Sequence, residues 1–480
     1  MNKLAKNYIY NVLYQVFLIV VPIITAPYLT RTISSGFLGI YDYVNSVVSI
    51  ITTIGLIGLQ SYGYRQIAYD RDNSRVIAKS FSEIFSLRVC LLIIVSLVYL
   101  PFVLFSSQSI FFLIQYPLIV AQFLDLSWVF IGFEELGIVS LRNFLAKFIT
   151  VIGIFLLVKG DADLWIYFAI FSFTTFLTSL SIVPLVRKYV RFNKPSFRSI
   201  FSHILPSIKL FIPQIATVMY LQFDKVMLKV LSNSSSQVAY YGYAEKIINI
   251  PLAIITALGT VMMPRLANLF SNNQKDKIPQ YLFRTIEFAM YIAIPMLVGL
   301  SSISTSFIPW YLGEEYIATA RVIIVLSPIC VLNALSNILG AQYLTATNQT
   351  KILTIAYYSA AGINIALNAL LIPIYGCMGA AVATVASSLL SVIIQLHSVE
   401  KEISFKGIIG KMIPKVVSSI IMGAVIIFVV FISPAQPLFT IIEVILGIVI
   451  YVVLSVLFRD QTAFYIIDRI KNIRFGRNDK

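Results

Sequence analysis

The sequence predicts an all-α membrane protein with about 14 transmembrane helices, and three observations lead to this fold class. Apolar runs of about 20 residues fill most of the chain, and a helix of that length spans a bilayer core of roughly 30 Å. Of all residues, 59% are hydrophobic and only 12% are charged, whereas soluble domains carry about 25% charged residues. Lys and Arg collect in every second gap between the runs. Each run should be helical, because a backbone in lipid must satisfy its own hydrogen bonds.

Polar or basic gaps separate the apolar runs and set the limits of the expected spans. The first run follows Lys3 and Lys6, as a signal peptide would, but it is too long and lacks a small-residue cleavage site, so we expect a retained helix. Gaps such as Ser106–Ser109 and Ser433–Pro437 are too short for an extracellular domain. The expected spans are 9–30, 37–60, 86–106, 110–131, 138–158, 163–186, 208–231, 238–262, 285–308, 318–343, 352–373, 377–397, 412–432 and 438–458.

The distribution of Lys and Arg predicts the orientation of the chain. Basic residues favour cytoplasmic loops, and the gaps expected outside hold little beyond Lys159, with Arg31 and Arg321 at helix ends. We therefore expect both termini in the cytoplasm. The same rule explains the net charge of +15 without a nucleic-acid surface. The basic residues expected inside are Arg65, Arg71, Arg75, Lys79, Arg187, Lys188, Arg191, Lys194, Arg198, Arg265, Lys275, Lys277, Arg284, Lys401, Lys406, Lys411, Arg459, Arg469, Lys471, Arg474, Arg477 and Lys480.

A short internal repeat predicts two lobes. Gly39–Tyr43 resembles Ala239–Tyr243, and Arg65 falls opposite Arg265. Six spans separate the copies, so both have the same orientation, as in two six-helix lobes related by an axis along the bilayer normal, with the substrate path between them. The last two spans form an added pair. The expected division is an N-terminal lobe at 1–204, a C-terminal lobe at 205–400, and the added helices with a basic tail at 401–480.

The gap Arg187–Ile204 is the longest basic gap and the expected boundary between the lobes. Its composition fits two interpretations. It is either an inside loop that follows the charge rule, or a segment that binds anionic lipid headgroups.

Several short motifs lie at the ends of the expected spans. They are Pro27–Arg31, Gly36–Tyr41, Asp125–Glu134, Asp224-Lys225, Tyr240–Tyr243, Pro264-Arg265 and Tyr311–Tyr316. In their order and placement, together with about 14 spans, these motifs resemble the Wzx-type polysaccharide flippases of the multidrug/oligosaccharidyl-lipid/polysaccharide (MOP) exporter superfamily. The resemblance covers nearly the whole chain.

The resemblance implies a V-shaped, two-lobed fold that alternates between inward and outward states. It also implies an undecaprenyl-diphosphate-linked oligosaccharide as substrate, flipped from the cytoplasmic to the outer leaflet of a bacterial membrane for surface polysaccharide assembly. Expected partners are membrane lipids, a polysaccharide polymerase, glycosyltransferases, and H⁺ or Na⁺ as a coupling ion. The residues alone support a two-lobed polytopic transporter.

Charged residues inside spans are costly and therefore candidates for function. Asp224 and Lys225 lie in span seven, Glu245 and Lys246 in span eight, and both pairs lie roughly 12 Å below the connecting loop at 1.5 Å per residue. Cross-hairpin pairing would neutralise all four. Alternatively, the lysines face the cavity and attract a diphosphate, with Arg31 adding charge near the outer mouth. Asp42, Asp224 and Glu245 are the candidates for ion pairing or ion coupling.

Polar and aromatic residues on the same helices suit a glycan. Tyr41 and Asn45 share a helix face, as do Tyr241, Glu245 and Asn249, at a spacing of four residues. These tyrosines could instead belong to an interfacial aromatic belt. In the motif that ends span four, we expect Asp125, Trp128 and Glu134 to tie that span to the following inside loop.

The sequence gives no support for catalysis, a metal site or a cofactor. His203 and His397 have no carboxylate or cysteine at a useful spacing, and no phosphate-binding loop occurs. Competing functions are a drug/cation antiporter, which should have an acidic cavity, a peptidoglycan lipid-precursor flippase, a membrane polymerase or glycosyltransferase, and a non-transporting scaffold. An enzyme would need a large extramembrane loop or an acidic motif, and the repeat argues against a scaffold.

Overall fold

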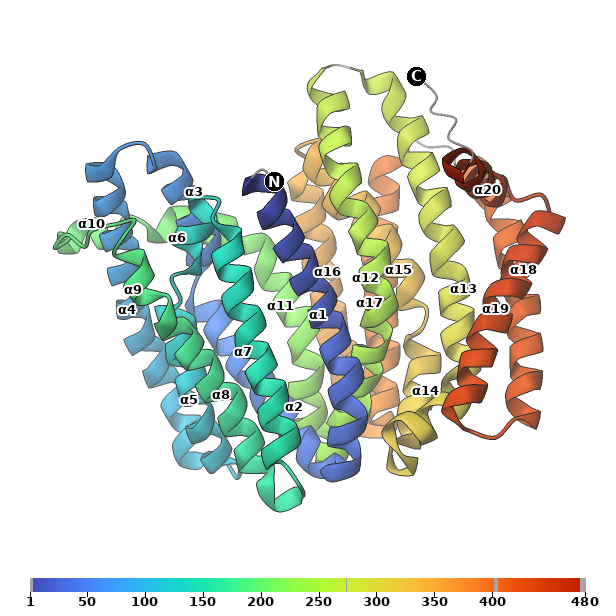
Figure 1. The fold of residues 1–480 in the computed structure, drawn as a ribbon, viewed down its shortest axis with the longest axis horizontal. Helices are drawn as coiled ribbons and strands as arrows, with labels where there is room; N and C mark the ends of the chain where they lie inside the picture. Colours follow the sequence, from blue (N-terminus) through green and yellow to red (C-terminus); the bar gives the residue numbers. More distant parts are fainter. Residues whose placement is uncertain (1–2, 273, 401–404, 475–480) are drawn as a thin grey trace. The chain divides into compact units, whose positions relative to one another are not determined.

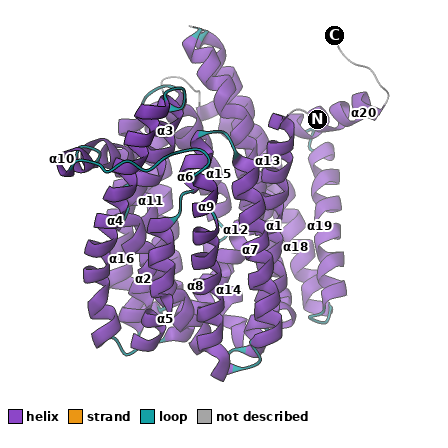
Figure 2. Ribbon diagram, turned by 60° about the vertical axis from the view of Figure 1, so that its left-hand side comes forward, coloured by secondary structure: helices purple, strands orange, loops and turns teal. Residues whose placement is uncertain are grey.

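A computed structural model describes residues 3–272, 274–400 and 405–474, with some side chains inside these ranges left out. Within these ranges the chain forms helices and loops without a β-strand (Figure 2). Two compact units are present, 1–239 and 240–480. Of the basic residues expected inside, Lys401, Arg477 and Lys480 lie outside the described residues, as do the side chains of Lys275, Lys406, Arg469, Lys471 and Arg474.

The first unit is a bundle of long helices with short helical segments at one end (Figure 1). Its helices are α1 (Lys3–Thr32), α2 (Ser35–Gly55), α3 (Leu59–Asp70), α4 (Ser74–Phe105), α5 (Ser109–Leu124), α6 (Ser127–Gly132), α7 (Leu136–Leu157), α8 (Leu164–Ser181), α9 (Val183–Val186), α10 (Phe197–Phe201) and α11 (Ile204–Ser232).

The second unit contains most of α12, the long helix whose first residues belong to the first unit. Its helices are α12 (Ser235–Ser271), α13 (Ile278–Leu312), α14 (Ile317–Leu326), α15 (Ile329–Ser336), the π-helix η4 (Asn337–Leu344), α16 (Thr350–Tyr375), α17 (Cys377–Val399), α18 (Phe405–Ile432), α19 (Pro437–Leu457) and α20 (Gln461–Arg474).

The helices confirm an all-helical polytopic membrane fold, but not the expected count of 14 spans. In the described part of the chain, 11 helices are long and apolar enough to cross a membrane, or 12 if a pair bent by 48° is one span. That pair, Glu314–Leu326 with Ile329–Leu344, replaces the straight helix expected at 318–343. The expected spans 208–231 and 238–262 coincide with α11 and α12, where several side chains are not described.

Helix ends follow the internal repeat. The first helix of each repeat ends at Thr32 and Ser232, and the next begins at Ser35 and Ser235, the same offset of 200 residues that the motifs show. The copies then diverge, because α2 ends at Gly55 while α12 continues to Ser271. The arrangement of the two units as parallel lobes, and the expected boundary at 204, stay predictions.

The second expected span, 37–60, is wrong at its end. Ile57 and Gly58 have φ angles of 44° and 77°, and this left-handed turn stops α2 and redirects the chain into α3. A Cβ on Gly58 would lie 2.8 Å from Cβ of Phe211, so only glycine fits both the conformation and the space. The Ser207 hydroxyl donates to the Ile57 carbonyl at 2.8 Å. These contacts hold α11 within the first unit.

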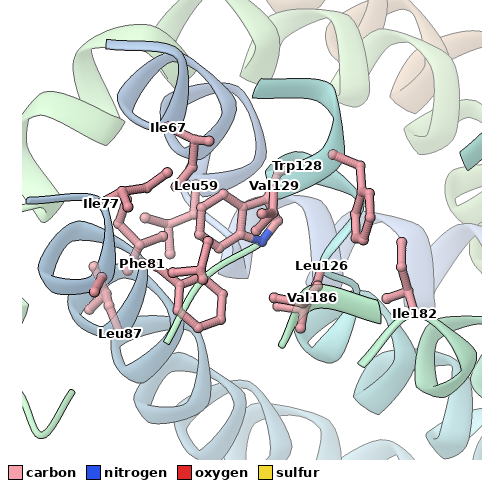
Figure 3. Close-up of a cluster of buried hydrophobic side chains, with 14 of the residues drawn as sticks. Leu59, Ile67, Ile77, Phe81, Leu87, Leu126, Trp128, Val129, Ile182 and Val186 are labelled. Carbon is pink, nitrogen blue, oxygen red and sulfur yellow. The ribbon is translucent and has the colours of Figure 1, made fainter. Parts of the chain in front are cut away.

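A hydrophobic core at one end of the first unit surrounds Trp128, which is fully buried (Figure 3). The indole ring stacks on Phe81, with ring centroids 5.8 Å apart. A Cβ at Gly63 would lie only 2.7 Å from the indole, so α3 can pack here only with glycine at that position. The core joins α3, α4 and α6 into a rigid end of the bundle.

One arginine is completely buried in the first unit. Arg88 of α4 donates from Nε to the Phe123 carbonyl at 2.9 Å and from Nη2 to the Gln122 carbonyl at 2.6 Å. Nη1 donates to the Gln60 side chain at 3.2 Å. The guanidinium therefore satisfies carbonyl groups at the end of α5, which lack partners within their own helix.

The added helix pair of the second unit contains a buried ion pair. Lys415 of α18 and Asp460, just before α20, are each 1% exposed and lie 3.0 Å apart. Asp460 also accepts the backbone N–H of Thr462 at 2.8 Å, which caps the start of α20. In the preceding residue, Arg459, φ is 55°, so the chain turns sharply between α19 and α20.

Candidate substrate-binding site

A polar cavity of about 240 Å³ lies among the helices of the first unit. Its walls come from α1, α7 and α8 and from the end of α5, in the half of the bundle where α7 begins and α8 ends. In the expected orientation this is the cytoplasmic half. The lining residues are Tyr14, Gln122, Asp125, Arg142, Asn143, Ala146, Lys147, Thr150, Phe171, Thr174, Thr175, Thr178 and Ser179.

Arg142 organises one wall of this cavity. Nη1 lies 3.1 Å from Oδ1 of Asp125, and Nη2 donates to the Ser127 hydroxyl at 2.7 Å. Ser127 in turn donates to Asp125 at 2.6 Å. The break between α5 and α6 places Asp125 and Ser127 side by side, because residues two apart would point away from each other on a continuous helix. The result is a cation that the Asp125 carboxylate and the Ser127 hydroxyl hold in place.

Lys147 supplies a second positive charge to the cavity. It lies on α7, and its ammonium is 5.5 Å from the centre of the Phe171 ring. The remaining walls are mostly hydroxyl groups of Thr and Ser, with the amides of Gln122 and Asn143. Hydroxyls, amides and aromatic rings suit a sugar, and two cations around one carboxylate suit a phosphate or diphosphate.

The second unit has an apolar groove of about 440 Å³. Hydrophobic side chains from α13, α15 and α18 form its walls. The lining residues are Ile286, Met290, Ile294, Leu297, Val298, Val331, Leu335, Met412, Val416 and Ile420. Such a surface suits a hydrocarbon chain.

The predicted site residues of the first repeat lie on α1 and α2. Arg31 is exposed near the end of α1. Tyr41 is buried, with its ring 4.2 Å from that of Tyr167, and Asp42 is only 6% exposed. Asn45 is half-buried one turn further along α2. These four residues lie outside the lining of the polar cavity.

The predicted residues of the second repeat lie on α12. Tyr241 is buried and its hydroxyl is 2.9 Å from that of Thr384 on α17. The ammonium of Lys246 lies 4.4 Å from the Tyr243 ring centre. Glu245 is half-buried and Asn249 is exposed.

The expected cross-hairpin pairs stay predictions. Asp224, 1% exposed, and half-buried Lys225 belong to the first unit. Glu245 and Lys246 belong to the second unit.

The motif after span four is divided among three surroundings. Asp125 binds Arg142 on α7, and Trp128 lies in the hydrophobic core. Glu134 is largely exposed and pairs with Arg71 at 2.9 Å, with a φ angle of 61°. The ion pairs of Asp125 and Glu134 join the segment to neighbouring elements. The expected tie between span four and the following inside loop stays a prediction.

Sequence reasoning missed several ionisable residues inside the expected spans. Arg142 and Lys147 lie within 138–158, and a consistent search for charges in that run would have found them. Glu443 of α19 is 1% exposed and accepts a hydrogen bond from Ser306 at 3.0 Å. Glu287 of α13 pairs with Lys411 at 3.3 Å. Among the described residues, no group of three or more His, Cys, Asp or Glu is placed to hold a metal ion.

Comparison with protein families gives two matches. The family described as "Polysaccharide biosynthesis protein" matches residues 4–270, and the family MatE matches residues 210–370. A Shigella dysenteriae protein named as an O-antigen transporter is 24% identical over 386 residues, covering 79% of this chain and 96% of the relative. A Haloferax volcanii protein named as a low-salt glycan biosynthesis flippase is 25% identical over 342 residues, covering 69% and 70%.

Solved structures of two transporters share the fold. The lipid II flippase MurJ, in an inward closed conformation, aligns with a TM-score of 0.73 at 18% identity, over 95% of this chain and 99% of MurJ. An inward-facing multidrug MATE transporter of the MOP superfamily aligns with a TM-score of 0.64 at 12% identity, over 80% and 93%.

Proposed function

Because the chain belongs to the polysaccharide biosynthesis protein family and is a Wzx-type flippase of the MOP superfamily, we propose that it flips an oligosaccharide linked to undecaprenyl diphosphate. The lipid-linked glycan moves from the cytoplasmic to the outer leaflet of a bacterial membrane, by alternating access of two lobes, for surface polysaccharide assembly. A polymerase and glycosyltransferases are the proposed partners, and H⁺ or Na⁺ is the proposed coupling ion.

The polar cavity of the first unit carries this proposal. Its cations, Arg142 and Lys147, and its Thr and Ser hydroxyls lie inside helices long enough to span a membrane. Charged groups within membrane-spanning helices are costly and rare, so those that occur indicate a functional site. The headgroup of the substrate offers the matching chemistry, with phosphates for the cations and sugar hydroxyls for the polar walls.

The apolar groove of the second unit supports the same class of substrate. A polyprenyl chain must stay in an apolar surrounding while its headgroup crosses, and the groove between α13, α15 and α18 offers one. Each surface by itself matches one part of an amphipathic lipid: the cavity matches the headgroup, and the groove matches the hydrocarbon chain.

The residues predicted from the repeats complete the proposed path. Lys225 and Lys246 are proposed to attract the diphosphate, with Arg31 near the outer mouth. Tyr41, Asn45, Tyr241 and Asn249 are proposed to contact sugars, and Asp42, Asp224 and Glu245 to take part in ion pairing or coupling. Lipid II is the second candidate substrate, favoured by the similarity to MurJ over 95% of the chain.

A reconstituted flipping assay tests the proposed function. The purified chain in lipid vesicles should move a fluorescent undecaprenyl-diphosphate oligosaccharide to the leaflet that a membrane-impermeant quencher reaches, faster than protein-free vesicles do. Lipid II and a fluorescent phospholipid serve as comparison substrates. Faster movement of lipid II than of the oligosaccharide would favour the second candidate, and equal rates for all three lipids would contradict both. Imposed H⁺ or Na⁺ gradients identify the coupling ion.

Cytoplasmic termini are a further expected result of the Lys and Arg asymmetry. Single cysteines placed within Ser106–Ser109, Ser232–Gln237 or Ser433–Pro437, on a background without Cys90, Cys330 and Cys377, should react with an impermeant maleimide added to intact cells. Cysteines placed within Arg187–Arg198 should react only after the membrane is opened. The reverse labelling pattern would mean that the orientation is inverted.

A further inference from the structure

The segment between α9 and α11, together with the first turn of α11, exposes an unusual set of aromatic and aliphatic side chains. Phe192 is 58% exposed, Phe197 74%, Phe201 39% and Leu205 63%. The rings of Phe197 and Phe201 lie against each other, with centroids 4.9 Å apart. Exposed basic residues alternate with them along the segment, at Arg191, Lys194 and Arg198. The exposed surface of this segment therefore carries both apolar and cationic side chains.

The segment is also fixed to α4 and to the hydrophobic core. The backbone N–H of Asn193 donates to the Ser82 hydroxyl at 2.8 Å, and Ile200 of α10 is buried in the hydrophobic core. Figure 1 shows α10 beside the first turns of α4. The backbone that carries the exposed residues is therefore fixed in place.

His203 completes the attachment at the end of the segment. Its Nε2 lies 2.9 Å from the Glu83 carboxylate, and its Nδ1 lies 2.8 Å from the Tyr62 hydroxyl. Burial, with the charges of Asp70 and Glu83, raises the pKa of Tyr62. The hydroxyl therefore stays protonated and can donate a hydrogen bond to Nδ1 of His203. The imidazole therefore links α3, α4 and the start of α11.

The position of the segment along α4 indicates which part of the membrane it meets. Exposed apolar side chains cover α4 from Val89 to Phe105, the surface expected to meet lipid. Phe192 packs edge-on against Phe85, with ring centroids 6.4 Å apart. Phe85 precedes Val89 by four residues, or roughly 6 Å of helix. Phe192 and its neighbours therefore lie where the hydrocarbon of the bilayer gives way to its headgroups.

We propose that Arg191–Leu205 is a membrane-surface anchor, which inserts its phenylalanines into the headgroup boundary and binds anionic lipid through Arg191, Lys194 and Arg198. Phe and Leu side chains of interfacial segments insert at this boundary, and basic residues near it gain from negatively charged lipids. The anchor continues the lipid-facing surface of α4. Its proposed occupant is the anionic leaflet around the protein, which corresponds to the second of the two interpretations of the basic gap.

A spin label at position 197 tests the depth of the anchor. The full chain, with Phe197→Cys on a background in which Cys90, Cys330 and Cys377 are serine, is labelled and reconstituted in phosphatidylcholine vesicles containing phosphatidylglycerol. The label should collide readily with oxygen, which dissolves in lipid, and poorly with a water-soluble nickel chelate. The matched control is Tyr69→Cys, at the end of α3, where the side chain is 72% exposed; there the nickel chelate should collide freely.

Equal nickel accessibility at positions 197 and 69 would overturn the proposal. It is also the result expected if the face binds a protein partner, because the vesicles contain none.

A charge test separates anionic lipid binding from a simple excess of positive charge. With the segment otherwise unaltered, the label at position 197 should be less accessible to the nickel chelate in vesicles with phosphatidylglycerol than in vesicles without it. Replacing Arg191, Lys194 and Arg198 with Gln should remove this difference. The control triple, Arg65, Arg75 and Lys79 to Gln, removes the same charge from α3 and α4 and should preserve that difference. If the anchor triple leaves the difference intact, or the control triple abolishes it equally, the proposal fails.

Discussion

Replacing Lys415 with Met is expected to destabilise the second unit by about 3–5 kcal/mol, because it leaves a buried carboxylate without its cation. Asp460 is 1% exposed, and Lys415 is the cation that contacts it at 3.0 Å. The loss should appear as a lower midpoint of thermal unfolding in detergent. Proteolysis near α20 should also become faster, because Asp460 caps the first turn of that helix.

A double variant distinguishes the lost charge partner from lost packing. Asp460→Asn removes the negative charge but keeps an oxygen that can accept the Thr462 N–H. Combined with Lys415→Met, it should recover most of the stability that the single change removes. A double variant as unstable as Lys415→Met alone would show that the side chains matter for packing rather than for charge.

Replacing Lys147 with Met is expected to slow flipping of the lipid-linked oligosaccharide by at least about tenfold, which corresponds to ~1.4 kcal/mol. The cavity would keep Arg142, which Asp125 holds, but would lose one of its two cations. The unfolding midpoint shows whether a lower rate comes from a loss of stability instead. Initial flipping rates and unfolding midpoints should be measured on the same preparation.

Two controls accompany this variant. Lys147→Arg keeps the charge and should retain most of the rate. Lys351→Met removes an exposed lysine from the start of α16 and should leave the rate unchanged. Normal flipping by Lys147→Met would mean that the cavity of the first unit does not bind the headgroup.

The membrane helices could be predicted from the sequence because each depends on the composition of one continuous segment. Apolar runs, for example, place α7 at Leu136–Leu157 against an expectation of 138–158. The same approach failed at Ile57, which is as apolar as the residues around it but adopts a left-handed conformation that ends α2. It also failed in the middle of 318–343, where a bend of 48° divides an apolar run.

The polar cavity was harder to predict because its walls come from helices distant in sequence. Asp125 was recognised from its motif, yet its partner, Arg142, lies on the next long helix, and no local pattern connects them. The hydroxyl groups of the cavity wall could not be predicted for the same reason. In the sequence, Thr174, Thr175 and Thr178 are ordinary polar residues of a membrane helix, and they form a wall only because α8 packs against α7. A search restricted to charges near the repeat motifs therefore found the lysines of α11 and α12 but missed Lys147.

The buried guanidinium of Arg88 also makes α4 and α5 depend on each other. Without α5, the guanidinium would lose the Phe123 and Gln122 carbonyls, which accept two of its hydrogen bonds. Without Arg88, those carbonyls at the end of α5 would have no partner within their own helix, and an unpaired backbone group is costly where water is absent. The register between the two helices is therefore set by polar contacts that neither helix can satisfy by itself.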